Sequence, residues 1–415
     1  MAQYSDTCFL CGYFSSRIPH PHGIRALADA GWTMQPYDKA AADEYRRFYY
    51  PEFVDFWLGS GDGDNDRPVV TFTTPCCGGA GPEFAAGCDG QLQSIRLCMM
   101  PFGMVLYAIE LTLEGDDLNA FTLTLSRLRG SFASVPAIAR PLRRAMDALG
   151  VPADAPMIES GNKLKLFHIV RCLTPEAVAA AAAGDATLFQ LGSLVRVAPY
   201  DPADPDEISP SYLAATIRDS KLSFYNNWTA LALFDTFTIL AHDVPDWMVK
   251  NWCEDYFGKI YMHSLFSKFY LYRQNARFRA DPDAGEDIEK ELNEFERTCC
   301  FHHISYNFMP GEVDRAIDRS LDLAPERSLL RSYIATCNEQ RAKTSDRRVN
   351  ALLTLLTVLT VASTLWDFSS MVNALYPFGT QFGSEATGFR AVVSAAILII
   401  LCAVLYIMLP RRKKA

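Results

Sequence analysis

The sequence predicts an α+β cytoplasmic domain, followed by long helices and by a stalk helix that is continuous with the first of two C-terminal transmembrane helices. Segments with strand and helix patterns alternate up to about residue 225, as in domains that mix the two element types. Long helical patterns follow. Two runs without a charged residue, 349–366 and 391–409, stand near the C-terminus. Each is long enough to cross a hydrocarbon core of about 30 Å at ~1.5 Å per residue.

In the first 225 residues the elements follow from local pattern and turn residues. Residues 1–57 mix short apolar stretches with turn signals, and 59–67 and 76–82 are glycine-rich loops that match no phosphate-binding fingerprint. Residues 121–129 fit either a third strand or the start of a helix. Strands are expected at 69–73, 91–100, 103–113, 164–172 and 188–197, and helices at 136–149 and 175–183.

The region 226–348 is mainly helical in its pattern. Its first run, 226–241, is apolar but contains Asp235, so we interpret it as a buried helix or a pair of strands, with Asp235 paired in the core or placed at an interface. A helix is expected at 243–279 and another at 286–308, where Pro310 and Gly311 break it. From Pro325 to Trp366 no proline or glycine interrupts the pattern, which predicts about 60 Å of continuous helix.

The basic residues define a topology for the two uncharged runs. The first run follows Arg341, Lys343, Arg347 and Arg348, and the second precedes Arg411, Arg412, Lys413 and Lys414. Lysine and arginine favour the cytoplasmic side, so both termini are expected there. The chain then divides into 1–225, 226–348, a first span at 349–368, an outer loop at 369–390, a second span at 391–410 and a basic tail at 411–415. A buried helical hairpin in a soluble core is the alternative.

Composition limits the function classes. The net charge of −9 argues against direct nucleic-acid binding. The N-terminus lacks the basic and apolar regions of a secretory signal, so residues 1–340 are expected in the cytoplasm. In that reducing compartment the twelve cysteines should be mostly free thiols. No nucleophile, base and acid occur with motif spacing, so an enzyme is not expected.

One stripe of the first predicted span is polar or small. It consists of Asn350, Thr354, Thr357, Val361 and Thr364, at steps of three and four, and continues to Phe368. A polar stripe faces other helices or water rather than lipid, so several copies should associate. In a ring the stripe would line a pore, where its oxygens replace part of a cation's hydration shell. Alternatively, the threonines bond back to their own helix or hold helices together.

The outer mouth of such a pore would be formed by Asp367, Met371 and Asn373. A ring of Asp367 carboxylates would concentrate cations there. A lone interfacial charge beside Trp366 is the alternative reading of Asp367.

Four sequence features resemble those of a known family. They are the stretch Asn350-Ala-Leu-Leu-Thr-Leu-Leu-Thr357, the pair Gly388-Phe389, Tyr406 near the end of the second run, and the basic tail. They are similar to the CorA-type divalent-cation channels, and the order of parts along the chain agrees. The resemblance implies a homopentamer in the bacterial inner membrane with cytoplasmic termini. It implies a divalent cation such as Mg²⁺ as permeant ion and no other cofactor.

The chain departs from that family at the outer end of the first span. It has Ser370-Met371-Val372-Asn373 where the family has Gly-Met-Asn, and the proline late in the span is missing. Magnesium selectivity is therefore not implied. The chain looks similar to the divergent CorA-like proteins encoded beside type III CRISPR systems, which act in antiviral defence. That similarity implies a nucleotide second messenger bound to the cytoplasmic domain, at a pocket that the sequence does not place.

Other interpretations stay open. The hairpin could tether a ligand-binding sensor that conducts no ions, or the chain could be a plain divalent-cation transporter. Two groups of side chains are weak metal-site candidates. They are the zinc candidate Cys8, Cys11, His20 and His22, and the set Cys299, Cys300, His302 and His303, expected within five residues of one helix.

Overall fold

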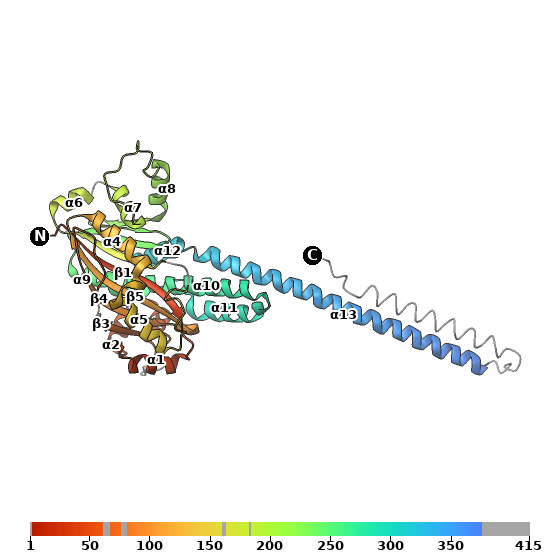
Figure 1. The fold of residues 1–415 in the computed structure, drawn as a ribbon. Coiled ribbons are helices and arrows are strands. Elements are labelled where there is room, and N and C mark those ends of the chain that lie inside the picture. Colours follow the sequence, from red (N-terminus) through yellow and green to blue (C-terminus); the bar gives the residue numbers. More distant parts are fainter. Residues whose placement is uncertain (1, 61–66, 76–80, 160–162, 182–183, 376–415) are drawn as a thin grey trace. The chain divides into compact units, whose positions relative to one another are not determined.

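The computed structural model describes residues 2–60, 67–75, 81–159, 163–181 and 184–375 (Figure 1). The second uncharged run, most of the predicted outer loop, the basic tail and much of both glycine-rich loops lie outside these residues. The chain divides into two compact units, residues 1–331 and 332–415.

The described strands of the first unit form one mixed sheet of nine strands. Their order is β2-β3-β4-β5-β1-β6-β9-β8-β7, and every neighbouring pair is antiparallel except β6 and β9. The strands are β1 (Tyr4–Ser15), β2 (Thr33–Met34), β3 (Val70–Pro75), β4 (Cys88–Met99), β5 (Met104–Gly115), β6 (Lys165–Cys172), β7 (Lys221–Tyr225), β8 (Trp228–Ala232) and β9 (Thr236–His242).

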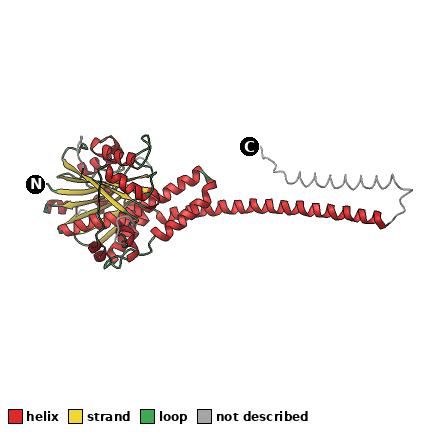
Figure 2. Cartoon of the chain, turned by 90° about the horizontal axis from the view of Figure 1, so that it is seen from below, coloured by secondary structure: helices red, strands yellow, loops and turns green. Residues whose placement is uncertain are grey.

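Helices cover both faces of this sheet (Figure 2). The helices of the described residues are α1 (His20–Asp29), α2 (Lys39–Tyr45), α3 (Pro51–Leu58), α4 (Leu118–Ser131), α5 (Pro136–Ala148), α6 (Pro175–Ala181), α7 (Asp185–Ser193), α8 (Pro210–Ser220), α9 (Asp246–Asn251), α10 (Met262–Ala280), α11 (Gly285–Cys299), α12 (Phe308–Ser320) and α13 (Leu323–Leu375). Between α9 and α10 lies the π-helical segment η4 (Trp252–Tyr261), and three short 3₁₀ turns are η2 (Pro101–Gly103), η3 (Phe132–Ser134) and η5 (Pro282–Ala284).

Strand β1 lies near the centre of the sheet and was not expected from the sequence. Its side chains are buried on both faces: Leu10 and Phe14 join the core beneath α1, α4 and α5, whereas the Phe9 ring stacks on Phe257 of η4 at 3.8 Å and Tyr13 stacks on Phe269 of α10. Because both faces are covered, the strand has no alternation of polar and apolar residues to mark it.

The local patterns predicted most of the remaining elements. Strands β3 to β6 and helices α5 and α6 lie where they were expected. The two ambiguous segments are settled: 121–129 lies in helix α4, and 226–241 is the strand pair β8 and β9. The predicted helix 243–279 is continuous through α9, η4 and α10, but its π-helical middle was not foreseen.

Two expectations are wrong. The predicted strand 188–197 is largely helix α7, in which Leu188 and Leu191 share the buried face at helical spacing. The helix expected at 286–308 ends at Cys299, and Pro310 does not break a helix. Pro310 instead lies in the first turn of α12, where its missing N–H costs no hydrogen bond. Strands β8 and β9, which follow residue 225, belong to the same sheet as the strands before it.

Helix α13 confirms the uninterrupted helix expected from Pro325 to Trp366. It begins at Leu323 in the first unit and continues in the second to Leu375, beyond the predicted end of the first span at 368. Only Leu321 and Asp322 separate it from α12, and Asp322 adopts the left-handed conformation (φ 54°) that aspartate tolerates better than most residues.

Candidate functional site

The predicted polar stripe lies on the second half of α13. Steps of three and four residues place its members along one side of the helix. The threonine hydroxyls donate to carbonyl oxygens one turn earlier: Thr354 to Asn350 at 2.7 Å, and Thr357 to Leu353 at 2.8 Å. Each hydroxyl hydrogen is thus engaged within the helix, but the oxygen keeps lone pairs that can accept a hydrogen bond or contact a cation.

Thr360 was missed as a member of this stripe. It lies three residues after Thr357 and four before Thr364, on the border of the stripe, and its hydroxyl donates to Leu356 at 2.8 Å. Thr364 in turn donates to the Thr360 carbonyl oxygen at 2.7 Å. The same three-and-four spacing that identified the other threonines would have found it.

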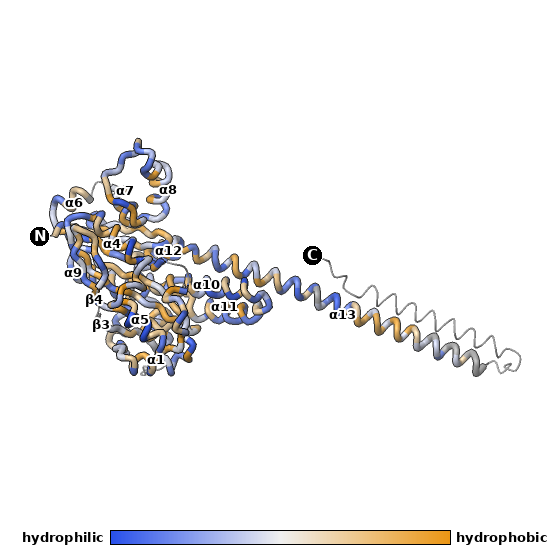
Figure 3. The backbone as a smooth tube through the Cα atoms, in the orientation of Figure 1, coloured by the Kyte–Doolittle hydropathy of each residue, from blue (hydrophilic) through white to orange (hydrophobic). Residues whose placement is uncertain are grey.

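Large apolar side chains accompany the stripe and are exposed. Leu352, Leu353 and Leu356 are each more than half exposed, and hydrophobic residues dominate this part of α13 in Figure 3. Exposed apolar surface of this extent is typical of a binding or assembly face. Among the residues that the structure describes, no helix combines the length and the apolar character needed to cross a membrane.

The predicted mouth residues lie on the last turns of α13 rather than in a loop. Asp367 and Met371 are one turn apart and therefore share a side of the helix, and both are exposed. Asn373 lies two residues further along the same helix.

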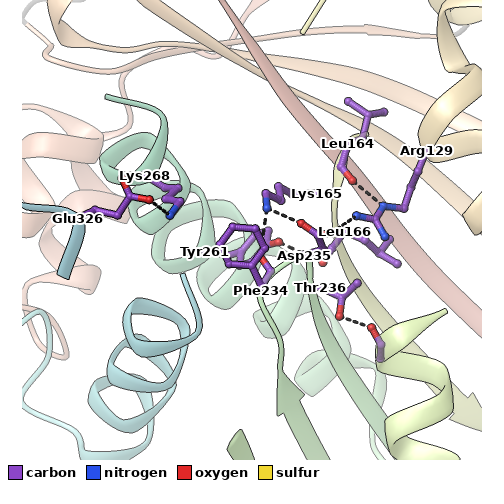
Figure 4. Close-up of polar contacts among 11 residues, drawn as sticks. Arg129, Leu164, Lys165, Leu166, Phe234, Asp235, Thr236, Tyr261, Lys268 and Glu326 are labelled. Atoms are coloured by element: carbon purple, nitrogen blue, oxygen red, sulfur yellow. Dashed lines mark hydrogen bonds and ion pairs between the residues drawn. The ribbon is translucent and has the colours of Figure 1, made fainter. Parts of the chain in front are cut away.

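The first turn of α13 is held to α10. Glu326 accepts from Lys268 Nζ at 2.7 Å with one carboxylate oxygen (Figure 4). Its other carboxylate oxygen accepts from Asn275 Nδ2 at 3.3 Å. The Lys268 side chain is 7% exposed and that of Glu326 30%, so the pair is largely shielded from water. Since α10 packs against the sheet through Phe269, these bonds connect the start of α13 to the centre of the first unit.

The turn between β8 and β9 lies beside this anchor. Asp235 pairs with Lys165 at 2.5 Å and with Arg129 at 3.3 Å, and the Phe234 ring lies 3.8 Å from Lys165 Nζ and 4.9 Å from Lys268 Nζ (Figure 4). Burial raises the pKa of Asp235, but the two cations outweigh it and the pKa lies below its usual value. Asp235 is paired as expected, but its carboxylate side chain is 45% exposed and so is not buried in the core.

A row of three hydrogen-bonded polar side chains is also buried in the sheet. His168 Nδ1 lies 2.9 Å from an Asp6 carboxylate oxygen, and its Nε2 lies 2.8 Å from the Thr238 hydroxyl. The side chains come from β6, β1 and β9, and all three residues are fully buried. Acid, imidazole and hydroxyl follow the order of a catalytic triad, but a substrate could not reach these atoms. These hydrogen bonds instead join the three adjacent strands β1, β6 and β9.

Neither metal candidate is assembled. Cys8 and Cys11 are three residues apart on β1 and therefore point to opposite faces of the sheet, whereas His20 and His22 lie in α1. In the second set only Cys299 lies in α11, which ends there, so Cys300, His302 and His303 do not share a helix with it. Among the described residues no group of three or more metal-binding side chains converges, and the described cysteines are free thiols. Burial raises the pKa of both the Cys8 and the Cys11 thiols.

Two features of the described chain are thus suited to function: the threonine stripe of α13 and the contacts of Glu326 that fix the start of that helix. The hydrogen-bonded row of Asp6, His168 and Thr238 stabilises the sheet instead. Comparison with known protein families, characterised proteins and solved structures gives no match.

Proposed function

We propose that this chain is one subunit of a homo-oligomeric, CorA-like ion channel of the bacterial inner membrane. The observation that carries the proposal is the construction of α13. One helix has its first turn bonded to the sheet domain through Glu326 and carries, further along, a threonine stripe beside exposed leucines. A ligand-dependent change in the first unit would reach the stripe along this helix.

The membrane part of the proposal rests on sequence and exposure together. The runs 349–366 and 391–409 contain no charged residue. Basic clusters precede the first run and follow the second. The exposed leucines of the first run require a cover, which lipid and neighbouring copies would provide. The second run, outside the described residues, enters the proposal by its sequence alone. Both termini would lie in the cytoplasm.

The pore part rests on the stripe of Asn350, Thr354, Thr357, Val361 and Thr364. A single helix cannot enclose a path, so several copies would place their stripes around one axis. The hydroxyl oxygens keep lone pairs for a partly dehydrated cation even while their hydrogens bond to the helix. The resemblance to CorA-type channels makes a pentamer and a divalent cation such as Mg²⁺ the expected arrangement.

The ligand part rests on resemblance. The divergent CorA-like proteins beside type III CRISPR systems make a nucleotide second messenger the expected ligand of the first unit, with antiviral defence as the expected role. A plain divalent-cation transporter, without such a ligand, is the simpler form of the same proposal.

One observation favours a second candidate, a membrane-tethered sensor that conducts no ions. The hydroxyls of Thr354, Thr357, Thr360 and Thr364 all donate to their own helix. Threonines that satisfy themselves in this way can face a neighbouring helix without lining a path.

Cation flux separates the two candidates. The full chain, purified and reconstituted into liposomes, should pass cations, and Thr357→Val should change the flux several-fold because it removes a pore oxygen while keeping the side-chain shape. Ser363→Ala is the matched control, since Ser363 lies on the opposite side of the helix and its loss should leave flux unchanged. Flux no greater than in empty liposomes, with and without nucleotide, would favour the tethered sensor.

A further inference from the structure

A pocket of about 810 Å³ lies in the first unit, away from the anchor of α13. It is formed where α2, the turn between β7 and β8, the helices α9 and η4, and the start of α12 meet. This volume is in the range of sites that hold small organic molecules. Nothing in the sequence had placed a binding site here.

The walls of the pocket are aromatic. Nine of its twenty lining residues are tryptophan, tyrosine or phenylalanine. Trp228 and Trp252 meet edge to face with ring centroids 5.3 Å apart, while Trp247 is 67% and Phe308 65% exposed. Exposed rings beside a concave site are typical of residues that cover a ligand. The π-helical segment η4 contributes part of the wall, and such segments occur frequently at functional sites.

The charged residues of the lining are mainly acidic. They comprise three carboxylates, Glu44, Glu254 and Asp255, and one ammonium group, Lys250. Asp255 is already bound by Lys259 and Asn251, and Lys250 lies 3.7 Å from Glu254. Glu44 forms no ion pair with any described residue. This balance repels an anion such as a nucleotide phosphate and attracts a cation, which the faces of the tryptophan rings attract as well.

We propose that this pocket binds a small organic cation that carries a planar ring. The rings of Trp247 and Phe308 would cover it, and the carboxylate of Glu44 would balance its charge. The proposal goes beyond ion conduction and holds whether or not the chain forms a channel. A nucleotide messenger, which is anionic, would bind elsewhere in the first unit.

Tyramine is a suitable probe because it combines a planar ring with an ammonium group. Its matched anion, 3-(4-hydroxyphenyl)propionate, keeps the ring and its phenolic oxygen but replaces the ammonium group by a carboxylate. Isothermal titration of the full chain in detergent should show tyramine binding at least tenfold more tightly than the anion. Trp247→Ala should weaken tyramine at least tenfold and Glu44→Gln severalfold.

Tyr272→Ala is the control, because Tyr272 is an exposed aromatic residue outside the pocket, and it should bind tyramine like the unmodified chain. Thermal unfolding of each variant checks that it is folded, which is expected since Trp247 and Glu44 are exposed. The proposal is overturned if tyramine does not bind, if the anion binds as tightly, or if folded Trp247→Ala binds tyramine unchanged.

Discussion

His168 joins the adjacent strands β1, β6 and β9 of the sheet through hydrogen bonds that no solvent reaches. Its ring lies between Asp6 on β1 and Thr238 on β9, so each heterocyclic nitrogen has a partner. Buried polar groups stabilise a fold when they are fully paired and weaken it when one partner is lost. The centre of the first unit therefore depends on residues with no exposed surface.

Thr238→Val should lower the free energy of unfolding by about 1–3 kcal/mol, because it leaves the His168 Nε2 without its hydroxyl partner at constant side-chain volume. Thr238→Ser keeps the hydroxyl and should cost less, through the lost methyl group alone. Denaturant unfolding of the full chain in detergent measures both. Equal losses for the two variants would mean that the hydrogen bond contributes nothing.

His263 makes stability depend on pH. Burial among the rings of Phe53, Phe56 and Phe301 lowers the pKa of His263 from 6.5 to about 4. The unfolded chain therefore takes up this proton before the folded chain does, and stability is lost as pH falls from about 6.5 to about 4. The loss should reach roughly 3 kcal/mol over that range.

The variant His263→Asn does not titrate in this range and should show a correspondingly flatter dependence of unfolding free energy on pH between 7 and 4. The comparison is between slopes, so the carboxylates that titrate in both proteins cancel. Parallel slopes for the two proteins would exclude His263 as the titrating group.

At the scale of elements, the start of α13 depends on the shielded pair of Lys268 and Glu326. Lys268→Met keeps the length of the side chain but removes its charge, leaving Glu326 with Asn275 alone. A loss of about 1–3 kcal/mol is expected, less than for a fully buried pair because Glu326 is 30% exposed. Amide hydrogen exchange in residues 323–330 should also become faster.

Lys290→Met provides the control for this variant. Lys290 also pairs with a glutamate, Glu286 at 3.0 Å, but both side chains are about 70% exposed. Pairs so exposed contribute little to stability, so this variant should unfold almost like the unmodified chain. If the two lysine variants behaved alike, the anchor assigned to Lys268 would be wrong.

The elements also show what the sequence could predict. Strands β4 and β5 were predicted because local pattern and the break at Pro101 define them, and α13 because no proline or glycine interrupts it. Strand β1 was missed because burial on both faces removes its alternation. Helix α7 was taken for a strand because its apolar residues are few and closely spaced, which both periodicities fit.

Which parts of the candidate site could be predicted depends on how far apart their residues lie in the sequence. The stripe from Asn350 to Thr364 is local, so its spacing alone reveals it. The pair Lys268–Glu326 joins residues 58 positions apart, and the pair Asp6–His168 joins residues 162 apart. No pattern within one segment contains such pairs, since they arise only when the sheet and its helices pack. The aromatic pocket was hidden for that reason as well.

For the whole molecule, we propose that the first unit senses a ligand and that the C-terminal runs conduct ions. Conduction requires that the chain be an integral membrane protein. Two uncharged runs, with basic clusters before the first and after the second, predict an integral membrane protein. The exposed leucines of α13 are consistent with that prediction. The first property to measure is therefore whether lipid or protein surrounds these leucines in the cell.

Alkaline carbonate washing of membranes from bacteria that express the full chain tests this requirement most directly. The wash removes proteins that adhere to the membrane surface but leaves those that span the bilayer. The account predicts that the chain stays in the membrane pellet and is released only by detergent. Recovery of the folded chain in the carbonate supernatant would contradict the account and would mean that other protein surface, not lipid, covers α13.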